Sequence, residues 1–203
     1  MKIICVGRNY KNHILELKNK IPKEIMFFLK PETAIPSKNQ PFFIPDFSKE
    51  IHYEIEVVVK INKTGKHIQK KFSHTYYNDI TLDVDFTARD IQKEIKKNGE
   101  PWEKAKSFDG SAPIGKFIHK NEFEKLNNLN FKLFINKKLR QNGNTKNMIF
   151  KIDDIISYIS KFITLKRGDL IFTGTPSGVG QVEKEDLLDG FIENKKVIEV
   201  KIK

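Results

Sequence analysis

The chain has 203 residues, of which 38% are hydrophobic and 16 are Phe, so we expect one domain over residues 1–203 with a substantial core. The net charge of +11 comes mostly from Lys, which is interspersed with Asp and Glu, while Arg occurs at only four positions; this pattern argues against nucleic-acid binding. The single cysteine excludes an internal disulfide, and the apolar run over 2–6 is too short for a signal-peptide core or a membrane span. We therefore expect a cytoplasmic protein.

The first part of the chain predicts strands, one helix and a long loop. Runs of β-branched and aromatic residues that end at Gly or Pro are typical of strands. Tyr10, Ile14 and Leu17 have the spacing of one helix face. The expected elements are strands over 2–6, 26–31 and 53–61, a helix over 9–18, and an extended loop with three prolines over 33–45.

The rest of the chain predicts more strands than helices. The helix expected over 87–99 stops at Gly99, and the next one begins near Asp153 or Asp154. The order is not a regular alternation of strand and helix, which favours an α+β, mainly β fold. The expected elements are strands over 79–86, 132–136, 168–176 and 195–203, a hairpin after 136, and helices over 87–99 and 152–165.

Three acidic residues on neighbouring predicted strands form the first candidate site. Glu54 and Glu56 project from the same face of a strand, with their Cα atoms roughly 6.5 Å apart. Both could simply face solvent. Asp85 ends the next clear strand, however, and would lie beside the pair if the two strands are neighbours. Three converging carboxylates would repel one another unless a cation lies between them.

The ligand type indicates which cation fits. The five histidines are dispersed and there is one cysteine, so no set has the spacing of a zinc site. Hard carboxylate oxygens suit Mg²⁺, Mn²⁺ or Ca²⁺. Three acids also leave about half of an octahedral shell free for water and substrate, as in catalytic metal sites.

Three further groups carry weaker signals. His13 and Glu16 lie at i and i+3 of a predicted helix and could form a hydrogen-bonded dyad, although an exposed pair is the simpler reading. Lys106 precedes a Gly/Ser/Pro loop and could neutralise an enolate, or it could be one of many solvated lysines. The loop over 173–180 lacks the ending of a phosphate loop, but could bind a carboxylate or be a tight turn.

Six segments in order resemble the fumarylacetoacetate hydrolase family: "GRNYKNH", "FLKP", "HYEIEVVV", "DVDFTARDIQ", "KSFDGSAPIG" and "GDLIFTGTPSGVG". The resemblance runs from about residue 2 to 200, nearly the whole chain, and is closest to short, single-domain acylpyruvases and oxaloacetate decarboxylases. The resemblance implies a mixed β-sandwich roll with a few peripheral helices, usually a homodimer. Relatives often have Asn-Gly where this chain has Asn136-Lys137.

The resemblance also implies roles for individual residues. Glu54, Glu56 and Asp85 match the ligands of Mg²⁺ or Mn²⁺. His13 and Glu16 match a dyad that activates water, on a segment that closes over the bound ligand. The remaining matches are Gln92 and Lys106 around the reacting carbonyl, and Arg8, Gly174 and Thr175 at the substrate.

By this resemblance we expect a divalent-metal-dependent enzyme that cleaves small 2-oxo acids, as an acylpyruvate hydrolase, an oxaloacetate decarboxylase or both. A keto–enol tautomerase, or an isomerase of oxaloacetate or unsaturated dioic acids, is the alternative within the family. His13 and Glu16 favour hydrolysis over that alternative, because tautomerisation needs no activated water. A non-catalytic basic binding module is the alternative from another class, and the interleaved acids argue against it.

Overall fold

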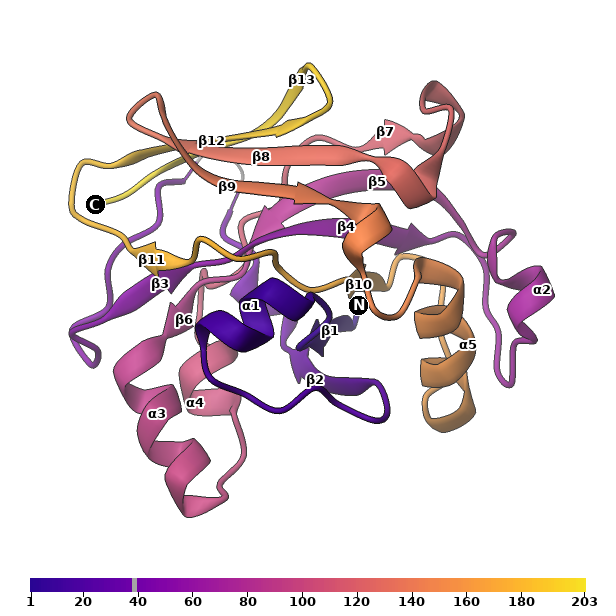
Figure 1. Cartoon of the computed structure of the whole chain (residues 1–203), viewed down its shortest axis with the longest axis horizontal. Coiled ribbons are helices and arrows are strands. Elements are labelled where there is room, and N and C mark those ends of the chain that lie inside the picture. Colours follow the sequence, from indigo (N-terminus) through magenta and orange to yellow (C-terminus); the bar gives the residue numbers. More distant parts are fainter. Residues whose placement is uncertain (38–39) are drawn as a thin grey trace.

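The computed structural model describes residues 1–37 and 40–203. It contains three β-sheets, with short helices at their margins (Figure 1). This architecture confirms the predicted α+β, mainly β fold. In the described part of the chain, we find no helix with the length and apolar character that a membrane crossing requires.

The central sheet has six strands. Only β1 and β10 pair in parallel; the other neighbours are antiparallel. Its inner strands are mostly buried and rich in β-branched residues, and β4 and β5 also bury the polar side chains of Glu56 and Asp83. The spatial order is β2 (Met26–Lys30), β1 (Ile3–Gly7), β10 (Leu170–Phe172), β4 (Ile55–Ile61), β5 (Tyr77–Val84) and β7 (Ile118–His119).

A four-stranded antiparallel sheet packs against β4 and β5 and completes the sandwich (Figure 1). Gly190 allows the two sheets to approach closely, because a Cβ atom there would lie 2.4 Å from Ile198 and 3.3 Å from both Ile55 and Leu82. The strand order is β13 (Lys195–Lys201), β12 (Leu187–Ile192), β8 (Asn130–Ile135) and β9 (Lys138–Asn144).

The third sheet divides a strand that the sequence predicts as continuous. It has the order β11 (Gly180–Gln181), β3 (Ile51–Tyr53) and β6 (Thr87–Ala88). The prediction of one strand over 53–61 is therefore wrong at Glu54, which lies between β3 and β4. Asp85 lies at the corresponding break between β5 and β6, and its N–H donates a 2.8 Å hydrogen bond to the Glu54 carbonyl. The segments around Glu54 and Asp85 pass from one sheet to another at the same level, and this places the two carboxylates side by side.

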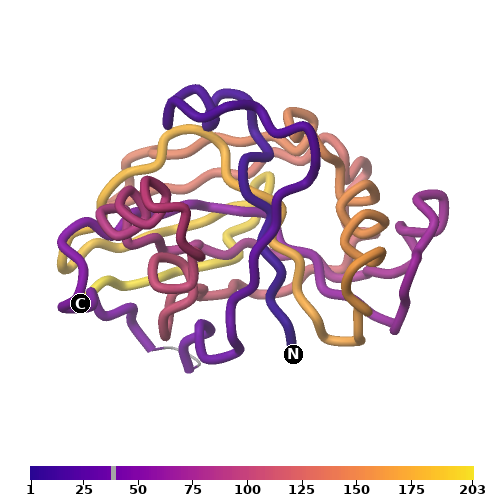
Figure 2. The backbone as a smooth tube through the Cα atoms, turned by 90° about the horizontal axis from the view of Figure 1, so that it is seen from below, coloured from indigo at the N-terminus to yellow at the C-terminus, as the bar shows by residue number. Residues whose placement is uncertain are grey.

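The longer helices lie at the margins of the sheets. In both views α5 lies at the opposite end of the molecule from α3 and α4 (Figures 1 and 2). Helix α3 ends at Gly99, whose φ of 72° is left-handed, as predicted. The helices are α1 (Lys11–Glu16), α2 (Lys70–Ser73), α3 (Arg89–Asn98), α4 (Glu103–Lys106) and α5 (Ile152–Phe162), and the 3₁₀ turns are Glu32–Ala34, Lys120–Glu122, Leu126–Asn128 and Thr145–Asn147.

Most other predicted elements are confirmed with shorter or shifted bounds, while β7, β11, β12, α2 and α4 were not predicted. The helix predicted over 87–99 is wrong at its first two residues, which form β6. In the predicted hairpin, Asn136 and Lys137 form the turn with φ of 50° and 65°, so Lys137 adopts the left-handed conformation that Gly would take more easily. The predicted loop over 33–45 contains one short 3₁₀ turn and an isolated bridge from Phe42 to Ile202. Residues 38–39 of that loop lie outside the described residues.

Candidate active site

Three buried carboxylates converge where β4 and β5 leave the central sheet. Glu54, Glu56 and Asp85 are 5%, 3% and 1% exposed, so the interpretation of the glutamates as solvent-facing is wrong. Each offers a carboxylate oxygen, and these three atoms all lie within 4.8 Å of one another. The antiparallel register, with Ile55 opposite Val84, brings them to one face of the sheet. The set could hold a hard divalent cation.

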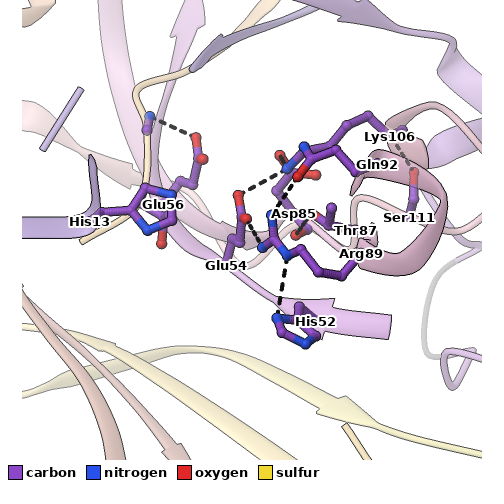
Figure 3. A network of polar contacts seen from close by, with 12 residues as sticks. His13, His52, Glu54, Glu56, Asp85, Thr87, Arg89, Gln92, Lys106 and Ser111 are labelled. Atoms are coloured by element: carbon purple, nitrogen blue, oxygen red, sulfur yellow. Dashed lines mark hydrogen bonds and ion pairs between the residues drawn. The ribbon is translucent and has the colours of Figure 1, made fainter. Parts of the chain in front are cut away.

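Two of the three acids already have cationic partners. The Lys106 Nζ lies 2.9 Å from Glu54 Oε2 and 2.7 Å from Asp85 Oδ2, and Arg89 forms an ion pair with Glu54 (Figure 3). The Lys30 Nζ lies 2.8 Å from Asp85 Oδ1. Burial alone would raise the pKa of Glu54, but Lys106 and Arg89 outweigh it and hold this pKa well below its usual range.

Glu56 has no cationic partner among the ion pairs of the described residues. Its Oε2 accepts a 2.7 Å hydrogen bond from the Gly174 N–H. Burial and the adjacent Asp85 carboxylate raise the pKa of Glu56 well above its usual value. The negative charge at this end of the cluster is therefore under-compensated, and a divalent cation held by these oxygens would supply the missing charge.

A fourth acid, Asp83, was missed by the sequence analysis. It lies directly opposite Glu56 in the β4–β5 register, so the two side chains share one face. Asp83 is fully buried, and neither of its carboxylate oxygens has a hydrogen-bond partner in the described part of the chain. Burial, Glu56 and Asp85 raise its pKa well above the usual value. The signal that could have revealed it is its i, i+2 spacing from Asp85, the same spacing that links the two glutamates.

Asp83→Asn is expected to raise the melting temperature of the metal-free protein at pH 8 by about 2–4 °C, because it removes a buried carboxylate without partners. The folded-state pKa of Asp83 is raised, so its destabilising effect is absent below about pH 4 and grows as the pH rises through that folded-state pKa. The gain should therefore vanish toward pH 4. Thermal unfolding of both chelator-treated proteins from pH 4 to 8 measures the difference in melting temperature. Equal melting temperatures of wild type and variant at pH 8 would contradict the prediction.

His13 of the predicted dyad lies on one side of the carboxylates, and Lys106 and Gln92 lie on the other (Figure 3). The Nδ1 of His13 lies 3.2 Å from Glu16 Oε2, and Glu16 Oε1 accepts a 2.9 Å hydrogen bond from the Gly178 N–H. Burial would raise the pKa of Glu16, but these two contacts outweigh it and lower this pKa. Glu16 thereby connects α1 with the loop over 173–180.

The remaining predicted residues surround the same cavity or support it. Gln92 accepts a 2.6 Å hydrogen bond from Arg89, and the Thr175 hydroxyl accepts one of 2.9 Å from Gln141. Gly174 has a φ of 94°, and its N–H donates a hydrogen bond to the Glu56 carboxylate and so helps to position it. The cavity is lined by eight of the predicted residues: Arg8, His13, Glu54, Glu56, Asp85, Gln92, Lys106 and Thr175.

Comparison with known proteins gives the family. The family model described as "Fumarylacetoacetate (FAA) hydrolase C-terminal" matches residues 2–203. The chain belongs to the fumarylacetoacetate hydrolase family. The resemblance stated from the sequence is therefore confirmed, and the mixed sandwich described above is the fold of this family.

Similar proteins of the fumarylacetoacetate hydrolase family have names that indicate oxo-acid chemistry. The mitochondrial oxaloacetate tautomerase of Mus musculus is 41% identical over 201 residues, which cover 99% of this chain and 91% of that protein. The mitochondrial oxaloacetate decarboxylase of Dictyostelium discoideum is 43% identical over 183 residues, 90% of this chain and 84% of that protein. The crystal structure of fumarylpyruvate hydrolase from Pseudomonas aeruginosa, in complex with Mn²⁺ and pyruvate, has a TM-score of 0.93 and 32% identity and covers 100% and 89% of the two chains.

Proposed function

We propose that the protein is a Mg²⁺- or Mn²⁺-dependent enzyme that cleaves small 2-oxo acids and releases pyruvate, with oxaloacetate and acylpyruvates as substrates. The observation that carries this proposal is the buried cluster of Glu54, Glu56 and Asp85, with a protonated lysine on one side and a His–Glu dyad on the other. The names of the relatives support oxo-acid substrates, and the Mn²⁺ and pyruvate in one similar structure support the cation and the product.

The bound cation would act as a Lewis acid on the 2-oxo group. Lys106 is placed to balance the negative charge that develops when the substrate becomes an enolate. Burial would lower the pKa of Lys106, but Asp85 and Glu54 outweigh it and raise this pKa, so the amine stays protonated throughout the neutral range. Arg89 contacts both Glu54 and Gln92 and so fixes the Gln92 amide beside this lysine.

The dyad supplies the proton transfers. Glu16 holds the Nδ1 side of the His13 ring, which leaves Nε2 to take a proton from water. Cleavage of an acylpyruvate needs this water to attack the distal carbonyl, and the bond to the pyruvate fragment then breaks. Decarboxylation of oxaloacetate needs no water, because the carbon–carbon bond breaks with loss of CO₂.

Glu16→Gln is expected to lower kcat for acetylpyruvate hydrolysis by about 100-fold or more, since His13 loses the carboxylate that orients it and raises its basicity. The kcat for oxaloacetate decarboxylation should fall much less. Steady-state rates with both substrates measure the difference, and Glu124→Gln, an exposed acid, is the matched control. Equal losses for the two substrates would show that the dyad acts in a step common to both reactions.

Keto–enol tautomerisation of oxaloacetate is the second candidate function, because the mouse relative is named an oxaloacetate tautomerase. It would use the same enolate and the same lysine, with His13 moving a proton at C3 in place of water. Both reactions would use the same candidate site.

One experiment separates these candidates. Metal-stripped protein is supplied with Mg²⁺ or Mn²⁺, and the enol absorbance of oxaloacetate and the release of pyruvate are followed together, with acetylpyruvate in parallel and uncatalysed metal-dependent decay subtracted. Pyruvate release supports cleavage, whereas a change in enol absorbance alone supports the tautomerase. Metal binding without either signal would refute both. Assembly as a homodimer and a cytoplasmic location stay predictions.

A further inference from the structure

Four cationic side chains line the cavity above the carboxylates: Arg8, Arg89, Lys96 and Lys106. Arg89 and Lys106 are paired with the acids. Arg8 and Lys96 have no acidic partner within the described residues: Lys96 Nζ donates a 3.0 Å hydrogen bond to the neutral Asn19 Oδ1, and Arg8 Nε is buried without a partner. Two cations of this cavity are therefore available to an anion.

The position of both residues keeps these charges at the cavity. Arg8 directly follows β1 with a φ of 57°, a left-handed conformation that is uncommon for a residue other than Gly. Lys96 lies in α3 and is half-buried. Its contact with Asn19, on the segment that follows α1, places it at the border between α3 and that segment. Burial and the neighbouring Arg8 and Arg89 cations lower the pKa of Lys96, which shows that like charges crowd there.

The charge of the whole cavity indicates what kind of substrate fits. Three carboxylates and four cations line it, and a bound divalent cation would leave a net charge of about three positive charges. A 2-oxo acid with one carboxylate neutralises one of them, whereas a dicarboxylate neutralises two. The excess positive charge is that of Arg8 and Lys96, which take no part in the ion pairs of Glu54 and Asp85.

We propose that Lys96, together with Arg8, binds the second carboxylate of the substrate and so makes the site selective for dianionic 2-oxo acids over acylpyruvates with a neutral acyl group. This inference rests on the proposed function and names the substrate class of the same site. Lys106 and the carboxylate cluster would hold the 2-oxo acid end, and the cation pair would hold the other end. Lys96 acts here as a specificity residue and takes no part in bond breaking.

The test compares Lys96→Met with Lys97→Met, its exposed neighbour on the same helix. We expect Lys96→Met to lower kcat/KM for oxaloacetate by about 10- to 100-fold, mainly through KM, because a charge-assisted contact is lost. The value for acetylpyruvate should change less than about 3-fold, and Lys97→Met should leave both substrates unaffected. Arg8→Gln, as a second variant, should shift the same ratio in the same direction.

Binding of unreactive ligands gives a readout independent of turnover. L-malate carries the second carboxylate and L-lactate lacks it, so titration calorimetry on the Mg²⁺-loaded protein should show tighter binding of malate, and Lys96→Met should remove the difference. If the wild type binds both equally, or if Lys96→Met lowers both kcat/KM values by the same factor, the proposal is overturned. If malate is preferred through Lys96 but neither oxo acid is turned over, this inference holds and the proposed function fails.

Discussion

Glu56→Gln is expected to weaken Mg²⁺ and Mn²⁺ binding by more than about 100-fold. Loss of a residue that only hydrogen-bonds a metal ligand costs roughly 10- to 100-fold, and Glu56 would bind the ion directly. Turnover should be lost together with the metal. Glu56 is the acid of the cluster without a cationic partner in the described structure, so its charge is the one that a bound ion would use most directly. Calorimetric titration of metal-stripped protein measures the affinity, and pyruvate release measures activity.

The substitution should leave the fold intact. A Gln side chain at this position can still accept the hydrogen bond from the Gly174 N–H, and the raised pKa of Glu56 shows that its charge is disfavoured when no cation is present. The metal-free variant is therefore expected to melt at or above the temperature of the wild type. Unchanged metal affinity in a folded Glu56→Gln protein would falsify the assignment of this cluster as the cation site.

The sequence predicts the strands better than it predicts how they pair. The run over 53–61 has the composition of one strand, and the structure divides it at Glu54, because β3 and β4 belong to different sheets. Local propensity contains no information about the partner strand, so such a break cannot be read from it. Strand β12 was missed for a related reason: Asp189 and Gly190 interrupt its apolar pattern, although Gly190 is what allows the sheets to meet.

The candidate site was predicted through its motifs, and apart from Asp83 the residues that the prediction missed are partners distant in sequence. Lys30 and Asp85 are 55 positions apart and meet only in the folded protein, and Arg89 and Glu54 are 35 positions apart. Lys104 and Lys106 look alike in sequence, yet helix α4 buries Lys106 against the carboxylates and leaves Lys104 exposed. Composition alone could not choose between these two lysines; the family motif did.

Lys106→Met is expected to affect stability and turnover in different ways. Lys106 is 3% exposed and contacts both Glu54 and Asp85, so its removal leaves two buried carboxylates with less compensation. Breaking such a buried pair costs about 3–5 kcal/mol. The melting temperature of the metal-free variant should therefore fall by roughly 6–20 °C, since 1 kcal/mol corresponds to about 2–4 °C for a chain of this size.

Divalent cations should restore much of this stability but not the activity. A cation held by Glu54, Glu56 and Asp85 compensates the carboxylates, so the melting temperature should rise more in Lys106→Met than in the wild type when Mg²⁺ is added. Turnover should remain at least about 100-fold lower, because nothing else then balances the enolate charge at that position. Lys104→Met makes the same substitution at an exposed position of α4 and is the control. Full activity of the Mg²⁺-rescued variant would show that Lys106 only stabilises the cluster.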